Sequence, residues 1–174
     1  MFERDPFAHP EALIRRVYAY IAYRIGDGPD AEDLMSETFE RGLRYRGSYD
    51  SAKGDPVSWL IGIARRVIFD SFASRHDPVE ESSEAASSHE MEARTLRRVE
   101  LHHALAQLDE ADRELIALRY GADLTTAQIA NLWNVRPNTI DVRLHRALER
   151  LRRTLADEGS AEEGAAAFEG RSAP

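Results

Sequence analysis

Residues 124–153 constrain the fold more than any other part of the chain, because they contain two helical patterns separated by a short turn. Thr125 can cap the backbone amide of Gln128, and the Gln128 side chain can reach back to Thr125, which is typical of a helix start. Asn134 follows about two turns later, and asparagine tolerates the left-handed backbone that ends a helix. Pro137 then suits the first turn of a second helix. The pattern predicts a short helix, a turn and a longer helix.

The second helix of this pair is predicted to be apolar on one face and cationic on the others. Its apolar positions recur at helical spacing and are Ile140, Leu144, Leu148 and Leu151. Between residues 136 and 153, six arginines stand against two acidic residues, a net charge of +4 that favours phosphate binding. An arginine-rich solvated helix would have the same composition, but it would not require the cap and the turn. We interpret the segment as a helix-turn-helix that binds duplex DNA.

In a helix-turn-helix the N-terminal part of the second helix enters the major groove, where side chains contact base edges and flanking phosphates. The candidate contacts are therefore the side chains at the start of this helix that lie off its apolar stripe. They are Arg136, Asn138, Thr139, Asp141, Val142, Arg143, His145 and Arg146. Asp141 would repel phosphate, but its carboxylate could accept a hydrogen bond from the amino group of cytosine.

Composition excludes several classes of protein. The 174 residues can form one medium domain or two small ones, and an abrupt change in composition after Phe72 favours two. The chain has no cysteine, which excludes disulfides and thiolate metal sites. No apolar run approaches the ~20 residues of a membrane span, and residues 1–10 are polar and acidic rather than a cleavable signal. We expect a cytoplasmic protein without membrane insertion.

The net charge of −8 is unfavourable for a DNA-binding protein until it is divided along the chain. The net charge is −2 for residues 1–73, −4 for 74–95, +2 for 96–153 and −4 for 154–174. The acidity is therefore concentrated in the segments with little to bury. Affinity for nucleic acid follows the local patch and not the sum, so the overall charge does not exclude DNA binding.

The same division predicts the domains. We expect a first domain at residues 1–73, a flexible linker at 74–95, a second domain at 96–155 and an acidic disordered tail at 156–174. The linker and the tail are rich in Ser, Glu and Ala, and they offer few apolar side chains to a core. Strand patterns are absent. The predicted fold class is all-α, with two small helical domains joined by a flexible acidic linker.

Within the first domain, apolar residues keep helical spacing over residues 13–25, 34–43 and 59–72. Asp30 is expected to cap the second helix, and Asp55 the third. In the second domain, we expect Gly121 to interrupt the chain just ahead of the helix-turn-helix.

Two clusters in the first domain suggest contacts with other molecules. Asp33, Ser36 and Glu37 share a helix face beside Leu34, an arrangement that suits a basic partner helix. Taken alone, the residues favour a solvated face that stabilises the helix N-terminus.

The loop after the second helix combines aromatic and cationic side chains, which together can stack unpaired bases and neutralise phosphate. This set is Tyr45, Arg46, Tyr49 and Lys53 in the loop, with Arg65 and Arg66 on the next helix. Core packing explains Trp59 equally well as a role in base stacking.

Three segments in this order resemble the extracytoplasmic-function class of bacterial RNA polymerase sigma factors. Residues 30–39, DAEDLMSETF, resemble the segment by which region 2 of these factors docks on the polymerase. Residues 58–65, SWLIGIAR, are similar to the promoter-melting helix, and residues 144–147, LHRA, to part of the recognition helix of region 4. Each segment alone is weakly specific, whereas the three with these gaps are specific. The resemblance covers roughly residues 10–155.

The resemblance implies a function for each cluster. Residues 1–73 correspond to region 2, which would bind core RNA polymerase through Asp33, Leu34, Ser36 and Glu37. The loop at residues 46–53, with Tyr45, Trp59, Arg65 and Arg66, would read and melt the minus-ten element of promoter DNA. Residues 96–155 correspond to region 4, which would bind the minus-thirty-five element. The class also implies an anti-sigma factor as inhibitory partner, a stress or signal response, no cofactor and no catalytic activity.

The sequence departs from the class in two places. Residues 71–76 are nearly neutral where a basic run is usual, so weak binding of upstream duplex by the first domain is expected. Asp141 and Val142 stand where the class commonly has a base and a small polar residue, which leaves the minus-thirty-five sequence open.

Two other functions compete with this interpretation. A stand-alone helix-turn-helix regulator, with an N-terminal domain that senses a ligand or dimerises, would not need to co-purify with core polymerase. A catalytic domain is disfavoured, because there is no phosphate-binding glycine loop and no pair of histidines at ligand spacing. The histidines are His9, His76, His89, His102, His103 and His145.

Overall fold

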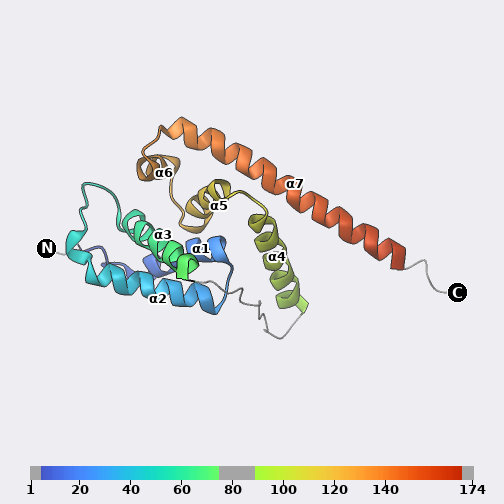
Figure 1. The fold of residues 1–174 in the computed structure, drawn as a ribbon, viewed down its shortest axis with the longest axis horizontal. Helices are drawn as coiled ribbons and strands as arrows, with labels where there is room; N and C mark the ends of the chain where they lie inside the picture. The colour runs from blue at the N-terminus through green and yellow to red at the C-terminus, as the bar shows by residue number, and fades with distance from the viewer. Residues whose placement is uncertain (1–4, 75–88, 170–174) are drawn as a thin grey trace.

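The structure is a computed structural model that describes the backbone of residues 5–74 and 89–169 and the side chains of residues 5–73 and 97–157. Within these ranges the regular elements are all helical and there is no strand, which confirms the predicted all-α fold class. Figure 1 shows the helices of the N-terminal half gathered on one side of α5 and α6, with α7 extending from α6 past α5 and α4.

The N-terminal half contains α1 (Pro10–Ile25), α2 (Pro29–Arg44), the 3₁₀ turn η1 (Arg46–Ser48) and α3 (Pro56–Ser74). Asp55 caps α3 as predicted, because its Oδ1 accepts hydrogen bonds from the amides of Val57 at 2.9 Å and Ser58 at 3.0 Å. The predicted cap of α2 is wrong. That helix begins at Pro29 after Gly28, whose φ of 144° suits glycine, so Asp30 lies in the first turn.

The C-terminal half contains α4 (His89–Ala106), α5 (Glu110–Ile116), the π-helical turn η2 (Ala117–Gly121), α6 (Thr126–Trp133) and α7 (Pro137–Glu169). Residues 75–88 of the predicted linker lie outside the described residues, and residues 89–95 belong to α4. Similarly, α7 continues through most of the predicted disordered tail. Alanine and glutamate are strong helix formers, and adding residues to an existing helix is easier than starting one.

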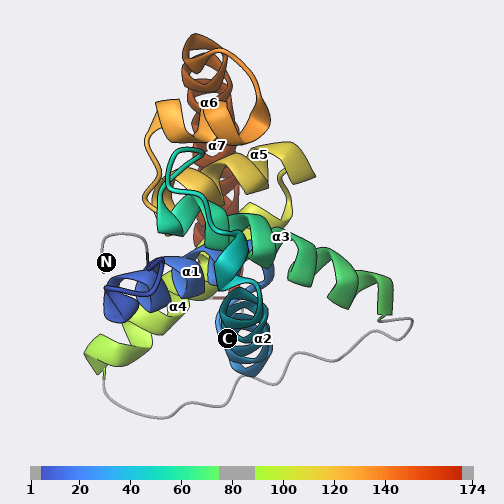
Figure 2. The same ribbon diagram turned by 90° about the vertical axis from the view of Figure 1, so that its left-hand side faces the viewer.

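The two halves share one hydrophobic core rather than each enclosing its own. Buried residues of α1, α2 and α3 form a continuous cluster with buried residues of α5, η2, α6 and α7, among them Leu118, Ile129 and Ile140. A smaller cluster lies between α4, α5 and α7 and includes Leu105, Ile116, Ala147 and Leu151. Figure 2 shows α5 next to α1 and α3, with α6 on the far side of α5. The predicted linker therefore connects halves that are in contact.

Gly121 allows the closest backbone approach between the halves. A Cβ atom at this position would lie 2.8 Å from Tyr20 Cα and 2.9 Å from the backbone oxygen of Ala19, distances that no real Cβ contact shows. The sequence indicated Gly121 as an interruption before the helix-turn-helix. The structure shows in addition that the residue must lack a side chain because η2 packs against the backbone of α1.

Gly121→Ala should therefore lower the free energy of unfolding by about 1–3 kcal/mol, the usual effect of overpacking. Gly62→Ala is the matched control, because Gly62 lies on the exposed side of α3 with nothing within 4 Å of an added Cβ. Alanine there should raise stability by about 0.5–1 kcal/mol, since glycine weakens a helix interior. Urea unfolding followed by circular dichroism measures both changes, and equal effects of the two substitutions would contradict the close approach.

Candidate nucleic-acid interface

The helix-turn-helix has the predicted local geometry. The Gln128 amide donates to Thr125 Oγ1 at 3.2 Å, and the Thr125 amide donates to Gln128 Oε1 at 2.8 Å, which completes the capping box. Asn134 adopts the left-handed conformation, with φ 53° and ψ 47°, and α7 begins at Pro137. The turn therefore ends α6 and starts α7 as the sequence predicted.

The apolar face of α7 is buried as predicted, with one residue that sequence reasoning missed. Ile140 and Leu151 are buried, and Leu144 and Leu148 are half-buried. Ala147 is fully buried between them, against α4 and α5. Its helical spacing from Leu144 and Leu151 was a sufficient signal, but alanine is too small to mark a core position by itself.

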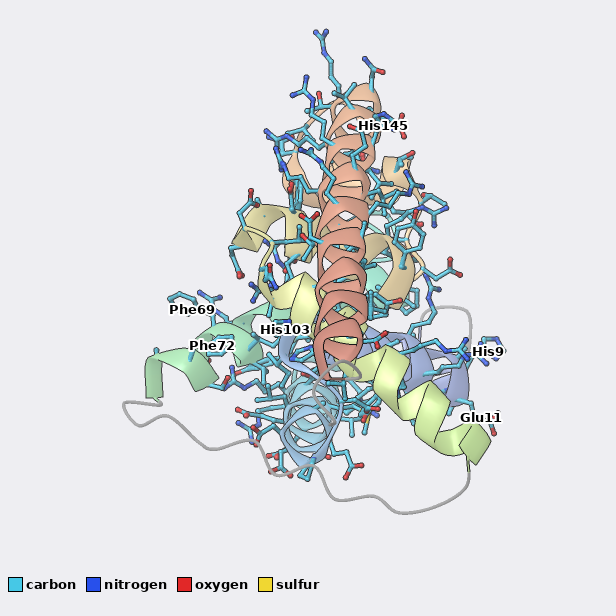
Figure 3. All side chains as sticks on the ribbon, turned by 90° about the vertical axis from the view of Figure 1, so that its right-hand side faces the viewer. His9, Glu11, Phe69, Phe72, His103 and His145 are labelled. Carbon is cyan, nitrogen blue, oxygen red and sulfur yellow. The ribbon has the colours of Figure 1, made fainter. Side chains whose placement is uncertain are left out.

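The other faces of α7 carry the predicted DNA contacts. Thr139 is half-buried, and the exposed members of the set are Arg136, Asn138, Asp141, Val142, Arg143, His145 and Arg146. Figure 3 shows His145 projecting from α7 at the end nearest the helix-turn-helix, and its Nε2 lies 3.6 Å from Glu149. Farther along α7, Arg150 pairs with Asp112 of α5. Among the described residues, no carboxylate forms an ion pair with Arg143 or Arg146, so the start of α7 carries free cationic charge. Arg152 and Arg153, farther along the described part of α7, form no ion pair with a carboxylate either.

The acidic stripe on α2 is only partly accessible. Asp33, Ser36 and Glu37 are exposed, whereas Leu34 is only 7% exposed and packs in the core, so its side chain does not extend the stripe. Glu37 pairs with Arg41 at 2.5 Å. Arg41 in turn pairs with Asp70 of α3 at 2.7 Å, which fixes this face of α2 against α3.

The loop at residues 45–53 has an exposed part and a packed part. Tyr45 is 54% exposed and Arg46 is also exposed, while the Tyr49 ring lies 5.5 Å from the Trp59 ring. The Tyr49 hydroxyl donates to the Gly54 carbonyl at 3.1 Å, and Lys53 lies 3.6 Å from Asp50. Burial, reinforced by nearby carboxylates, raises the pKa of Tyr49. Tyr45 therefore presents its ring to solvent, whereas the Tyr49 ring packs against the Trp59 ring.

The two arginines predicted on α3 have different environments. Arg66 is exposed, but Arg65 Nε lies 2.9 Å from Oε1 of Glu114, a buried residue of α5. Glu114 also accepts hydrogen bonds from the Tyr20 hydroxyl at 3.0 Å and lies 2.9 Å from Arg24 Nε. We call Tyr20, Arg24, Arg65 and Glu114 the Glu114 cluster.

Sequence analysis missed the Glu114 cluster because its members are far apart in the chain, with 94 positions between Tyr20 and Glu114. Burial, followed by the charge of Glu114, raises the pKa of Tyr20 well above its ordinary value, so the phenol remains a donor. Burial lowers the pKa of Arg24, but hydrogen bonding to Glu110 and the charge of Glu114 outweigh it and raise the pKa. The guanidinium therefore stays charged inside the protein.

Comparison with known proteins identifies both halves. The sequence profile described as "Sigma-70 region 2" matches residues 11–77, and that described as "Sigma-70, region 4" matches residues 98–151. The chain belongs to the sigma-70 family. Residues 11–77 are accordingly called region 2 below, and residues 98–151 region 4.

Its relatives place the chain in the extracytoplasmic-function class. It is 33% identical over 150 residues to the sigma factor BldN of Streptomyces coelicolor, covering 82% of this chain and 57% of BldN. Thus the chain matches just over half the length of that relative. It is 30% identical to CarQ of Myxococcus xanthus, covering 82% of this chain and 84% of CarQ. It is 31% identical to SigL of Mycobacterium tuberculosis, covering 85% of this chain and 92% of SigL.

Solved structures share the fold. The sigma factor RpoE of Bartonella quintana, in complex with the anti-sigma factor NepR, has a TM-score of 0.60 at 20% identity. The alignment covers 83% of this chain and 92% of that one. CnrH in complex with the cytosolic domain of CnrY gives the same TM-score and identity, covering 90% of this chain and 88% of CnrH.

Regions 2 and 4 of this sigma factor are also joined by hydrogen bonds outside the Glu114 cluster. Gln128 of α6 donates through Nε2 to Asp55 Oδ2 at 2.6 Å, so one glutamine completes its own capping box and also contacts the cap of α3. Arg16 of α1 donates to the backbone oxygens of Ala122 at 2.6 Å and Asp123 at 2.8 Å.

A groove of about 910 Å³ lies between regions 2 and 4. Region 2 contributes Phe69 and Phe72, which are 72% and 56% exposed, and region 4 contributes Trp133 and Arg143. Figure 3 shows the two phenylalanines projecting from α3 away from the core. Within the described residues there is no cluster of potential metal ligands, and no helix there is long and apolar enough to cross a membrane.

The pKa of Asp55 gives a pH-dependent test of its hydrogen bonds to the start of α3 and to Gln128. Burial raises the pKa of Asp55, but hydrogen bonds from Ser58, Gln128 and Val57 together lower it below its ordinary value of 3.8. Folding therefore favours the ionised carboxylate, and its stabilisation is present above pH 3.8 and is lost as the pH falls through the lower folded-state pKa.

Asp55→Asn removes this titration. The difference in unfolding free energy between the wild type and Asp55→Asn should be full at pH 6 and should shrink below about pH 3.8. Asp141→Asn, at an exposed carboxylate of α7, is the control and should show no such change. Urea unfolding from pH 3 to pH 7 measures both, and a difference for Asp55→Asn that is independent of pH would show that the ionised cap is not stabilising.

Proposed function

We propose that this sigma factor directs core RNA polymerase to promoters, with region 4 binding the minus-thirty-five element as duplex and region 2 binding and melting the minus-ten element. It supplies promoter recognition and is not itself catalytic. The free cationic charge at the start of α7, within an intact helix-turn-helix, is the observation that carries this proposal.

Region 4 is suited to reading duplex DNA. Arg136, Arg143 and Arg146 are exposed at the end of α7 that a helix-turn-helix inserts into the major groove. Arginine can donate two hydrogen bonds to a guanine edge or can pair with phosphate. Asn138 and Thr139 lie beside them, and Asp141 and Val142 provide an acceptor and an apolar contact for base selection.

Region 2 is suited to binding a melted strand. The exposed ring of Tyr45 can stack an unpaired base, and Arg46 and Arg66 can neutralise the adjacent phosphates. The Tyr49 ring packs against Trp59 and its hydroxyl donates to the Gly54 carbonyl, which anchors the loop to the start of α3. Lys53 is exposed at the end of the same loop.

The exposed acids of α2 are suited to a basic surface of core polymerase. Asp33, Ser36 and Glu37 supply the polar contact, and Leu34 supports the helix from the core instead of contacting the partner. The pairing of Glu37 with Arg41, and of Arg41 with Asp70, holds this face of α2 in place before any partner binds.

Two features of the class complete the proposal. The structurally similar RpoE and CnrH are both described in complexes, RpoE with an anti-sigma factor. We propose that this chain is likewise held by an anti-sigma factor, that a stress or other signal releases it, and that it acts in the bacterial cytoplasm where polymerase and DNA are found.

The first test concerns region 4. Replacing Arg143 and Arg146 by alanine should weaken promoter binding by the assembled holoenzyme by ~1–3 kcal/mol for each base contact and should flatten its salt dependence. Arg152→Ala with Arg153→Ala removes the same charge farther along α7 and should have a smaller effect. Fluorescence anisotropy at two salt concentrations measures both, and equal losses would indicate a general charge effect instead of recognition.

The second test concerns docking. Asp33→Asn with Glu37→Gln should weaken binding to core polymerase at least tenfold, because each substitution removes a charge from the exposed stripe without removing its bulk. Glu32→Gln with Glu40→Gln removes two other exposed charges from α2 and is the matched control. Titration of labelled sigma factor with core polymerase measures the affinities. Unchanged binding of the first variant would place the docking surface elsewhere.

A further inference from the structure

The groove lined by Phe69, Phe72, Trp133 and Arg143 has the size of a small-molecule site. Its volume of about 910 Å³ lies within the ~300–1,000 Å³ that is usual for pockets that bind drug-sized ligands. Such sites combine mostly apolar walls with a few polar groups that fix the orientation of the ligand. The chemistry of the groove walls therefore indicates which class of molecule would fit.

The walls provide aromatic rings on two sides. Phe69 and Phe72 lie about one turn apart on α3, and both side chains are largely exposed (Figure 3). Trp133, at the end of α6, lines the groove from region 4. Exposed phenylalanines leave apolar surface in water that a ligand would bury, and aromatic rings pack well against other flat rings. These residues favour a ligand with an apolar aromatic body.

The groove also carries a net positive charge. Four arginines and two glutamates line it, a net charge of +2. Both glutamates are paired, Glu110 with Arg24 and Glu114 with Arg24 and Arg65. Arg66 of α3 and Arg143 of α7 are exposed, and no carboxylate among the described residues forms an ion pair with either. Region 2 and region 4 thus each provide one guanidinium for an anion, which binds it through charge-assisted hydrogen bonds.

The lining offers little for the polar edge of a nucleobase. A nucleotide also combines an aromatic ring with an anion, but a specific site must give its base and ribose hydrogen-bond partners. The carboxylates of Glu110 and Glu114 and the hydroxyl of Tyr20, which line the groove, already have partners within the protein. The walls therefore favour an apolar ring system over a nucleobase.

We propose that this groove binds a small amphipathic anion, with its apolar aromatic body against Phe69, Phe72 and Trp133 and its anionic group at Arg66 or Arg143. Promoter recognition does not require such a ligand, so the site is an additional binding function of the chain. Its test uses the free chain without DNA or polymerase and is independent of the proposed function.

The fluorescent anion 1-anilinonaphthalene-8-sulfonate is a suitable probe, because it joins a naphthalene ring to a sulfonate. It should bind the free chain with a Kd at least about fivefold lower than that of N-phenyl-1-naphthylamine, the same molecule without its sulfonate. Phe69→Ala with Phe72→Ala should raise the Kd of the sulfonate probe at least about fivefold. Ile14→Ala with Leu43→Ala removes two other exposed apolar side chains and should leave it within about twofold.

A second pair of variants tests the charge of the groove without altering its apolar walls. Arg66→Gln with Arg143→Gln should raise the Kd of the sulfonate probe at least about fivefold and should leave the Kd of N-phenyl-1-naphthylamine within about twofold. Arg15→Gln with Arg152→Gln removes the same charge at two exposed positions outside the groove and is the matched control. Equal losses in the two pairs would reduce the effect to overall charge and would overturn the site.

The location of the bound probe can be measured because the chain has two tryptophans. Trp133 lines the groove, whereas Trp59 packs against Phe7 and Tyr49 and is not one of the lining residues. In proton–nitrogen NMR spectra, the sulfonate probe should shift the indole signal of Trp133 and leave that of Trp59 unchanged. Trp59→Phe assigns the two signals. A shift of Trp59 alone would place the probe elsewhere.

Three other results would overturn the proposal. Equal affinity of the wild type and both groove variants for the sulfonate probe would show that the groove is not its site. Displacement of the probe by adenosine monophosphate at the concentration at which naphthalene-1-sulfonate displaces it would make the groove a nucleotide site. A free chain that binds no probe, but is a dimer that Phe69→Ala with Phe72→Ala converts to a monomer, would show that a second copy covers the groove.

Discussion

The position of one buried carboxylate, that of Glu114, determines how the two regions are arranged. An isolated charge removed from water costs several kcal/mol, so burial of Glu114 requires a hydrogen-bond donor or positive charge close by. Tyr20 supplies the hydrogen bonds, and Arg24 and Arg65 supply the opposite charge, from two helices of region 2. Because those helices are rigid and already packed together, satisfying one carboxylate fixes the orientation of region 4 on region 2. The hydrogen bonds of Arg16 and Gln128 then follow from that orientation.

Most of the helical framework could be predicted because it depends on contacts within a few residues. The cap of α3 at Asp55, the capping box of Thr125 and Gln128, and the left-handed Asn134 are formed by neighbours in the chain. Asp30 was assigned the wrong role since a glycine followed by proline starts a helix without a side-chain cap. The helix after residue 155 was predicted as a disordered tail, because an acidic, alanine-rich composition is compatible with either state.

The candidate site could be predicted residue by residue but not as an arrangement. The exposed residues at the start of α7 are where helical periodicity places them, although their contacts with DNA remain predictions. Periodicity did not show that Leu34 faces the core, since an apolar residue beside an acidic stripe fits either face. Nor did it show that Arg65 forms an ion pair with Glu114, because the two residues lie on helices whose contact depends on the whole fold. Likewise, the steric role of Gly121 depends on the backbone of α1, about a hundred residues away.

A polar cluster within a largely apolar interface makes the contact between the regions specific. An interface of apolar side chains alone would tolerate small shifts. In the Glu114 cluster, by contrast, the Tyr20 hydroxyl donates hydrogen bonds to the carboxylate, and Arg24 and Arg65 form ion pairs with it, so the partners of Glu114 are specific. Arg65 of α3, which the proposed function assigns to minus-ten DNA, is therefore also part of the contact between regions 2 and 4 in this structure.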